Sequence, residues 1–281
     1  MDSLALTRPS ILSPFVPFLA VLTRDLRMSL RHWALWAWLI VSALTITMLI
    51  VEVNHAAATV VTAKIPVAPI SEETAEQLTT AESHFQRLLP ASVFVGKMLR
   101  FQLFFGITFA LILAATSLPT EADIASEAIL SRGIARAHYF IAKLVSRVIM
   151  VVLCLTVIAA VGATVGMSKM QNDIEWMGWL QVGGSFLILF AATAVFGYAI
   201  SGWFRNALVC IAVVWMFVYG IGIVSSVLEV PLVSPTIWAE QIPIALRTAE
   251  SYRPHNLSIA AALIASIISA VSLLSYTSKD V

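Results

Sequence analysis

The chain has little charge and little cysteine. Of its 281 residues, 12% are Asp, Glu, Lys or Arg and 59% are hydrophobic, whereas a soluble domain is about 25% charged. So few polar side chains cannot cover a water-soluble globule, which excludes that class and indicates an integral membrane protein. The two cysteines, Cys154 and Cys210, lie in apolar runs without a CxxC or a Cys/His cluster. We therefore expect them to be packing residues and not part of a disulfide or a metal site.

Six apolar runs dominate the chain instead. Each is long enough to cross about 30 Å of hydrocarbon as a helix, and they cover residues 33–53, 101–118, 148–167, 179–204, 207–228 and 257–276. No segment between them is large enough to fold alone. The sequence thus predicts an all-α integral membrane protein with six transmembrane helices, in a single domain that spans residues 1–281.

A further helix is predicted over residues 15–32, ahead of the first span. Arg24, Arg27 and Arg31 fall on one face, and the other face is apolar: Phe15, Phe18, Leu19, Leu22, Leu26, Leu30 and Trp33. This pattern is typical of an amphipathic helix that lies in the membrane interface. The alternative is a first transmembrane helix, which the four charges between Arg24 and Arg31 disfavour.

The distribution of Lys and Arg predicts an orientation. If the N-terminus is cytoplasmic, the inside segments hold ten of these residues and the outside segments hold seven. The positive-inside rule then places both termini in the cytoplasm. Residues 54–100 and 229–256 become external segments. The first contains a helix candidate at 72–89, and the second is Pro-rich and should form short helices and turns. The second also holds Trp238 and Tyr252, which suit an interfacial position.

Chemical motifs are missing as well. The sequence has no GxxxxGK[ST] loop, and its five histidines are scattered over different segments. No Ser/His/Asp or paired-carboxylate arrangement can be assigned, so we expect no enzyme active site, metal or cofactor in this chain. The middles of the six spans hold no ionisable side chain. Ion-coupled carriers usually need such side chains, and haem-binding anchor subunits need histidines there.

The segment 119–147 contains a group of basic residues. Arg132, Arg136, Lys143 and Arg147 fall within a stripe of about 60° on a continuous helix. The stretch from Asp123 to Arg147 resembles the first cytoplasmic loop of ATP-binding-cassette (ABC) permeases of the type-2 class. The matching residues are the acids Asp123 and Glu127, the turn residues Leu130, Ser131, Arg132 and Arg136, and then Tyr139 and Lys143; Gly133 stands where Pro is common.

Two distant segments share this resemblance. Helix 15–32 is similar to the elbow helix of that family, and Lys279 with Asp280 matches its C-terminal ending. The resemblance implies a membrane-spanning permease subunit of an exporter in the cytoplasmic (inner) membrane of a prokaryote. The partners that it implies are a separate soluble ATPase subunit that binds ATP, a second copy of this chain or a similar permease, and membrane lipids. We expect no nucleic acid among the partners.

The resemblance also assigns a role to the loop. Residues 119–147 would couple the spans to the ATPase, with docking residues Asp123, Glu127, Ser131, Arg132, Gly133, Arg136, Tyr139 and Lys143. The alternative is that these cations only enforce the positive-inside topology, which applies most to Lys143 and Arg147. Two other functions stay open: a membrane anchor subunit of an electron-transfer complex, and an ion-coupled carrier.

Overall fold

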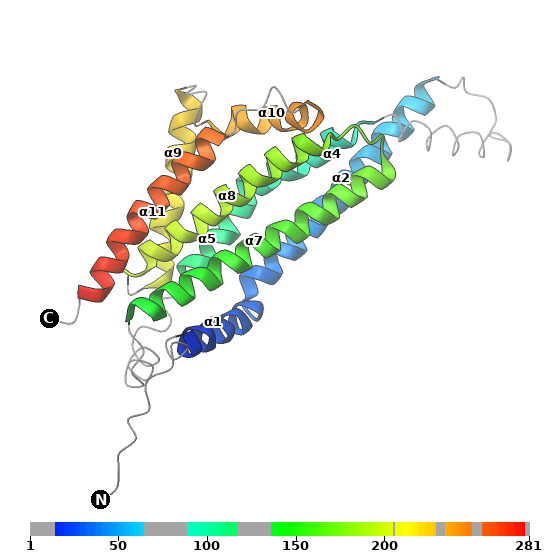
Figure 1. The fold of residues 1–281 in the computed structure, drawn as a ribbon. Helices are drawn as coiled ribbons and strands as arrows, with labels where there is room; N and C mark the ends of the chain where they lie inside the picture. Colours follow the sequence, from blue (N-terminus) through cyan, green and yellow to red (C-terminus); the bar gives the residue numbers. More distant parts are fainter. Residues whose placement is uncertain are drawn as a thin grey trace, which may run out of the picture.

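The computed structural model describes residues 15–64, 89–116, 136–204, 206–228, 234–248 and 255–278. About 91% of this part is helical and none of it forms a strand. The long helices lie side by side in a bundle (Figure 1). In chain order the elements are α1 (Phe15–Leu30), α2 (Trp33–Lys64), α4 (Ala91–Phe101), the π-helix η1 (Gln102–Gly106), α5 (Ile107–Ala115), α7 (Arg136–Lys169), α8 (Trp176–Ser201), α9 (Ala207–Val227), α10 (Pro235–Arg247) and α11 (His255–Ser278).

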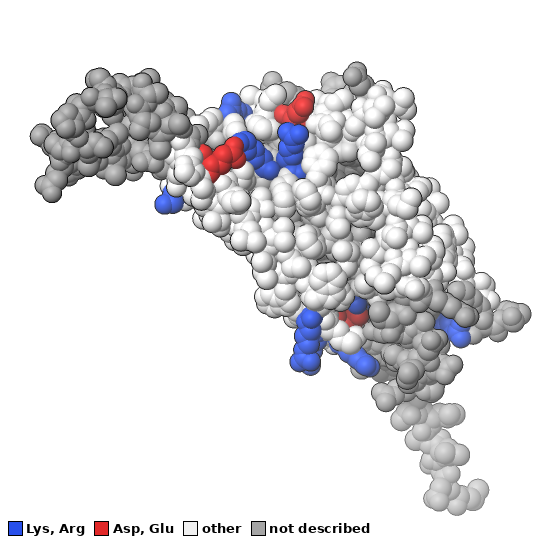
Figure 2. Space-filling model, turned by 180° about the vertical axis from the view of Figure 1, so that it is seen from behind, with Lys and Arg blue, Asp and Glu red and all other residues white. Residues whose placement is uncertain are grey.

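Six helical stretches are long and apolar enough to cross a membrane, which confirms the predicted fold class. They are Trp33–His55, Ala91–Ala115, Arg136–Lys169, Trp176–Ser201, Ala207–Val227 and Leu257–Ser278. On the face drawn in Figure 2, charged side chains gather near the two ends of the molecule and the band between them is uncharged. We call these the α1 end and the α10 end, after the short helices that lie there (Figure 1).

The second spanning helix begins earlier than the sequence predicted. The prediction started it at Phe101, because Lys97 and Arg100 were taken as external. In the structure α4, η1 and α5 run on without a break from Ala91. Lys97 Nζ lies 2.5 Å from Glu52 Oε1 of α2 in an exposed ion pair, so its charge is compensated while the helix continues. The predicted external segment 54–100 is therefore helical at both edges, and most of the helix candidate at 72–89 lies outside the described residues.

Helix α7 is longer than a membrane span. Its 34 residues cover about 51 Å at 1.5 Å per residue, and so include both the end of the predicted loop and the third span. Helix α1 packs along the first part of α7, where Val21 joins Tyr139 and Ala142 in a small buried cluster. As predicted, α1 is a separate helix ahead of the first span.

A polar cluster lies inside the apolar core, at the π-helix. The Gln102 side chain is fully buried. Its Oε1 accepts a hydrogen bond from Trp38 Nε1 at 2.8 Å, and its Nε2 donates to Ser42 Oγ at 3.0 Å. The wider turn of η1 also exposes the Phe104 carbonyl, which accepts from the Tyr219 hydroxyl of α9. The local π-helix thus ties α2 and α9 to the second span without leaving these buried polar groups unpaired.

The Pro-rich segment forms a short helix, as predicted, and α10 lies across one end of the bundle (Figure 1). Trp238 was predicted to suit the membrane interface. It lies on α10 at one end of the bundle, where its side chain is buried and its ring stacks on Phe186 of α8 with centroids 4.9 Å apart. Tyr252, the second aromatic residue of that prediction, lies outside the described residues.

Close packing against α8 and an ion pair fix the position of helix α10. A Cβ atom on Gly178 would lie 2.3 Å from the carbonyl oxygen of Ala245, so only glycine allows α8 to approach α10 this closely. Beside this contact, Arg247 Nε lies 2.6 Å from Asp173 Oδ2 and donates to Ser92 Oγ at 2.7 Å. The α10 end of the bundle is thereby closed by contacts among α4, the α7–α8 connection and α10.

Candidate functional site

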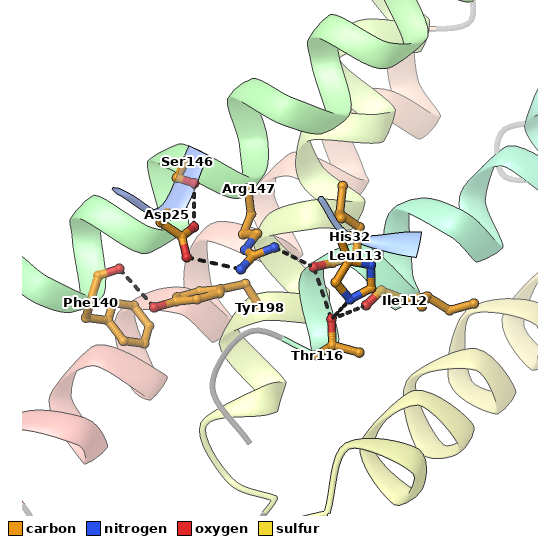
Figure 3. A network of polar contacts seen from close by, with 9 residues as sticks. All are labelled: Asp25, His32, Ile112, Leu113, Thr116, Phe140, Ser146, Arg147 and Tyr198. Atoms are coloured by element: carbon orange, nitrogen blue, oxygen red, sulfur yellow. Dashed lines mark hydrogen bonds and ion pairs between the residues drawn. The ribbon is translucent and has the colours of Figure 1, made fainter. Parts of the chain in front are cut away.

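Asp25 of α1 and Arg147 of α7 form a buried ion pair at the α1 end of the bundle (Figure 3). Arg147 Nη2 lies 3.1 Å from Asp25 Oδ1, and the two side chains are 6% and 1% exposed respectively. Ser146 Oγ donates to the other carboxylate oxygen at 2.5 Å. Because both oxygens of Asp25 accept a hydrogen bond, its negative charge is compensated despite its burial.

Arg147 also reaches a third element. Its Nη1 donates to the carbonyl oxygen of Leu113 at 3.4 Å. Leu113 lies in the last turn of α5, where carbonyls begin to lack partners within the helix and the helix dipole is negative. A cation is favourable at that position. One guanidinium therefore connects α1, α5 and α7.

His32 adds a second connection between the same elements. Its Nδ1 accepts a hydrogen bond from the Ala34 backbone N–H at 3.2 Å, so His32 caps the start of α2. In the neutral ring Nε2 then carries the proton and donates to Thr116 Oγ1 at 3.2 Å. Thr116 in turn donates to the Ile112 carbonyl at 2.8 Å. Figure 3 shows these hydrogen bonds beside the ion pair.

The electrostatics agree with a neutral His32. Burial and, to a smaller degree, the positive charge of Arg147 lower the pKa of His32 below its ordinary value of 6.5. The ring is thus uncharged near neutral pH. An uncharged ring can accept from Ala34, whereas a protonated ring has no free acceptor nitrogen.

The start of α7 is packed on two sides. Lys143 Nζ lies 5.1 Å from the centroid of the Tyr139 ring, and both side chains are buried. A cation over an aromatic face is partly compensated for its loss of water. On the other side, the Tyr198 hydroxyl of α8 donates to the Phe140 carbonyl at 3.1 Å. These contacts fix the helical turns that follow the predicted coupling loop.

The structure covers only part of the predicted docking set. Five of its members lie outside the described residues: Asp123, Glu127, Ser131, Arg132 and Gly133. Arg136 begins α7 and is half-buried, whereas Tyr139 and Lys143 are buried within the chain. Arg136, Lys143 and Arg147 lie on one continuous helix, which is the condition under which their spacing forms a single stripe. The arginines of the predicted interfacial helix, Arg24, Arg27 and Arg31, are exposed.

Two residues of this site were not predicted. Asp25 was counted only among the charges of the N-terminal helix, and His32 only among the five scattered histidines. A usable pattern was present, since Asp25 is four residues from both Val21 and Ser29 and therefore shares their helical face. All three side chains are buried, on a face separate from the arginines.

No family model and no curated protein matches this chain. In the part of the chain that the structure describes, no group of three or more His, Cys, Asp or Glu side chains could hold a metal ion. What the geometry does provide is a connection between α1, α5 and α7. Thr116 is the last described residue before residues 117–135, and Ser146 and Arg147 lie about three helical turns beyond Arg136, the first residue of α7.

We predict that Asp25 and Arg147 stabilise the fold as a unit. Loss of one partner leaves the other charge buried, which costs about 3–5 kcal/mol. Asp25→Ala and Arg147→Met should each lower the free energy of unfolding by about this amount. The double variant should lose clearly less than the sum. Denaturant unfolding of the purified protein in micelles, followed by tryptophan fluorescence, measures all three.

The matched control is the exposed pair Glu52 and Lys97, where truncation should cost about 0–1 kcal/mol. Strictly additive losses at Asp25 and Arg147 would contradict the prediction.

The lowered pKa of His32 predicts a pH dependence. As the pH falls through about 6.5, the unfolded chain takes up a proton at His32 before the folded chain does. The free energy of unfolding should therefore decrease as the pH falls below that value. His32→Asn removes the titrating ring and retains an acceptor that can cap α2. Between about pH 7.5 and about pH 5.5 the variant should lose less stability than the unmodified protein. Equal losses would show that His32 is not responsible.

Proposed function

We propose that this chain is the membrane-spanning subunit of an ABC transporter of the type-2 class, an exporter driven by a separate ATPase subunit. The six apolar helices supply the membrane domain that such a subunit requires. The observation that carries the proposal is the position of the buried network. Thr116 lies directly before residues 117–135. Ser146 and Arg147 lie on α7, the helix that follows this segment, about three turns beyond its first residue, Arg136.

The network would convert a movement of residues 117–135 into a movement of several helices. Thr116 is linked to His32, and Arg147 is linked to both Leu113 and Asp25. A partner that displaced this segment would therefore act on α5, α7 and α1 together. Helices are stiff, so the displacement would reach the membrane spans. ATP would bind to the partner, and the substrate would pass between two copies of this subunit or between it and a similar permease.

The docking contacts would come from charged residues of the segment and of the start of α7. Asp123, Glu127, Arg132 and Arg136 would form charge-assisted hydrogen bonds with the ATPase. Tyr139 and Lys143 are buried, so in this proposal they hold the start of α7 in place below the docking surface. The count of ten against seven basic residues supports a cytoplasmic position for this end of the protein. The membrane would be the inner membrane of a prokaryote.

Copurification tests the proposal. The tagged chain is purified in mild detergent from the cells that normally produce it, and the eluate is assayed for ATP hydrolysis and for proteins with a GxxxxGK[ST] motif. An Arg132→Ala, Arg136→Ala double variant should insert and fold normally. Its affinity for the ATPase should be about 30-fold lower than that of the unmodified chain, because an unpaired charge in a desolvated contact costs at least about 2 kcal/mol.

A second double variant controls for the loss of charge. Lys97→Ala with Arg100→Ala removes two basic side chains from the α10 end and should leave the copurified ATPase unchanged. If no ATPase accompanies the unmodified chain, the proposed function is wrong. If the ATPase binds equally well to both variants, the loop cations only set the topology.

A further inference from the structure

An unneutralised row of arginines follows the outer face of α1. Arg24, Arg27 and Arg31 are exposed and line a shallow groove of about 380 Å³. Their spacing of three and four residues places them on one side of the helix. The remaining lining side chains are small or flexible: Ala20, Thr23 and Met28.

No carboxylate of the described residues neutralises this row. Asp25 is the one acidic residue of α1, and it points inward to Ser146 and Arg147. Within the described part of the chain, the three guanidinium groups of the row form no ion pair with an acid. The cations resemble neither Lys97 nor Arg247, each of which has a carboxylate partner. The buried pair of the candidate site therefore leaves a net positive surface on the opposite face of α1.

Exposed apolar and aromatic side chains adjoin the arginines. Leu30, Trp33 and Trp36 are 49%, 63% and 54% exposed, and Trp36 Nε1 donates to the Leu30 carbonyl at the end of α1 at 2.9 Å. Tryptophan favours the boundary between lipid headgroups and acyl chains. Because the first span begins at Trp33, the arginine row lies where the chain enters the membrane.

We propose that this groove binds the phosphate groups of anionic phospholipids in the adjacent leaflet. Guanidinium groups bind phosphate through paired hydrogen bonds, and Leu30, Trp33 and Trp36 offer apolar surface to the acyl chains of the same lipid. A free phosphate ion would use the arginines alone. The combination of three unpaired cations with an adjoining aromatic surface fits a lipid better than a small anion. This inference is independent of the proposed transport function.

Lipid binding to the detergent-purified full-length chain tests the inference. Phosphatidylglycerol or phosphatidylcholine is added, and native mass spectrometry gives the affinity for each. The unmodified chain should prefer phosphatidylglycerol. Each cation near an anionic surface strengthens binding about fivefold, so Arg24→Gln, Arg27→Gln and Arg31→Gln together should weaken phosphatidylglycerol binding on the order of a hundredfold. Binding of phosphatidylcholine should change little.

Three controls separate the groove from general charge. Lys97→Gln, Arg100→Gln and Lys169→Gln remove the same number of charges elsewhere and should retain the preference. A triple Arg-to-Lys variant of the groove keeps the charges but loses the paired hydrogen bonds, so its affinity for phosphatidylglycerol should lie between those of the unmodified chain and the triple Gln variant. Inorganic phosphate at about ten times the lipid concentration should not compete, because it lacks the apolar contacts.

Several outcomes would overturn the inference. Equal weakening in the groove variant and the charge-matched control would reduce the effect to net charge. Competition by inorganic phosphate would identify a small-anion site in place of a lipid site. If the triple Gln variant does not fold, Arg31→Gln alone decides: about fivefold weaker binding supports the inference, and unchanged binding contradicts it.

Discussion

The arrangement of the α1 end depends on the buried ion pair between Asp25 and Arg147. Neither charge can leave water without the other, because an isolated ion in an apolar interior is far more costly than a paired one. The pair therefore fixes how α1 is rotated on α7. That rotation turns Val21, Asp25 and Ser29 inward and the arginine row outward. The same guanidinium binds the Leu113 carbonyl, so the end of α5 is positioned by the same contact.

Polar pairing recurs at the other levels of the bundle. In the core, the Gln102 side chain forms hydrogen bonds with Trp38 and Ser42. At the α10 end, Asp173 forms an ion pair with Arg247 and accepts a hydrogen bond from Ser92. Each cluster joins segments that are distant in sequence. In an apolar surrounding an unpaired polar group is costly, so each cluster selects one relative position of its helices. Apolar contacts alone, which are weakly directional, would allow neighbouring helices to slide.

The sequence predicted the features that depend on local composition. Six apolar runs and a separate helix with Arg24, Arg27 and Arg31 on one face follow from hydropathy and helical period. The features that it missed depend on partners far along the chain. The predicted start of the second span was too late in the sequence, because the residues around Lys97 do not indicate that it pairs with Glu52. Asp25 was overlooked for the same reason, since its partner Arg147 lies on another helix. The stacking of Trp238 on Phe186 could not be predicted either, because nothing in the neighbouring sequence indicates it.

Cross-linking measures most directly whether the ion pair holds α1 against α7. Val21→Cys and Ala142→Cys lie within one buried cluster, and the cross-link is followed in a background in which Cys154 and Cys210 are replaced by Ala. With Asp25 and Arg147 intact, oxidation should join the two helices rapidly. Adding Arg147→Ala should slow the reaction about tenfold or more, as a loss of at least about 1.4 kcal/mol in helix docking requires. An unchanged rate would show that α1 stays on α7 without the ion pair and would contradict the claim.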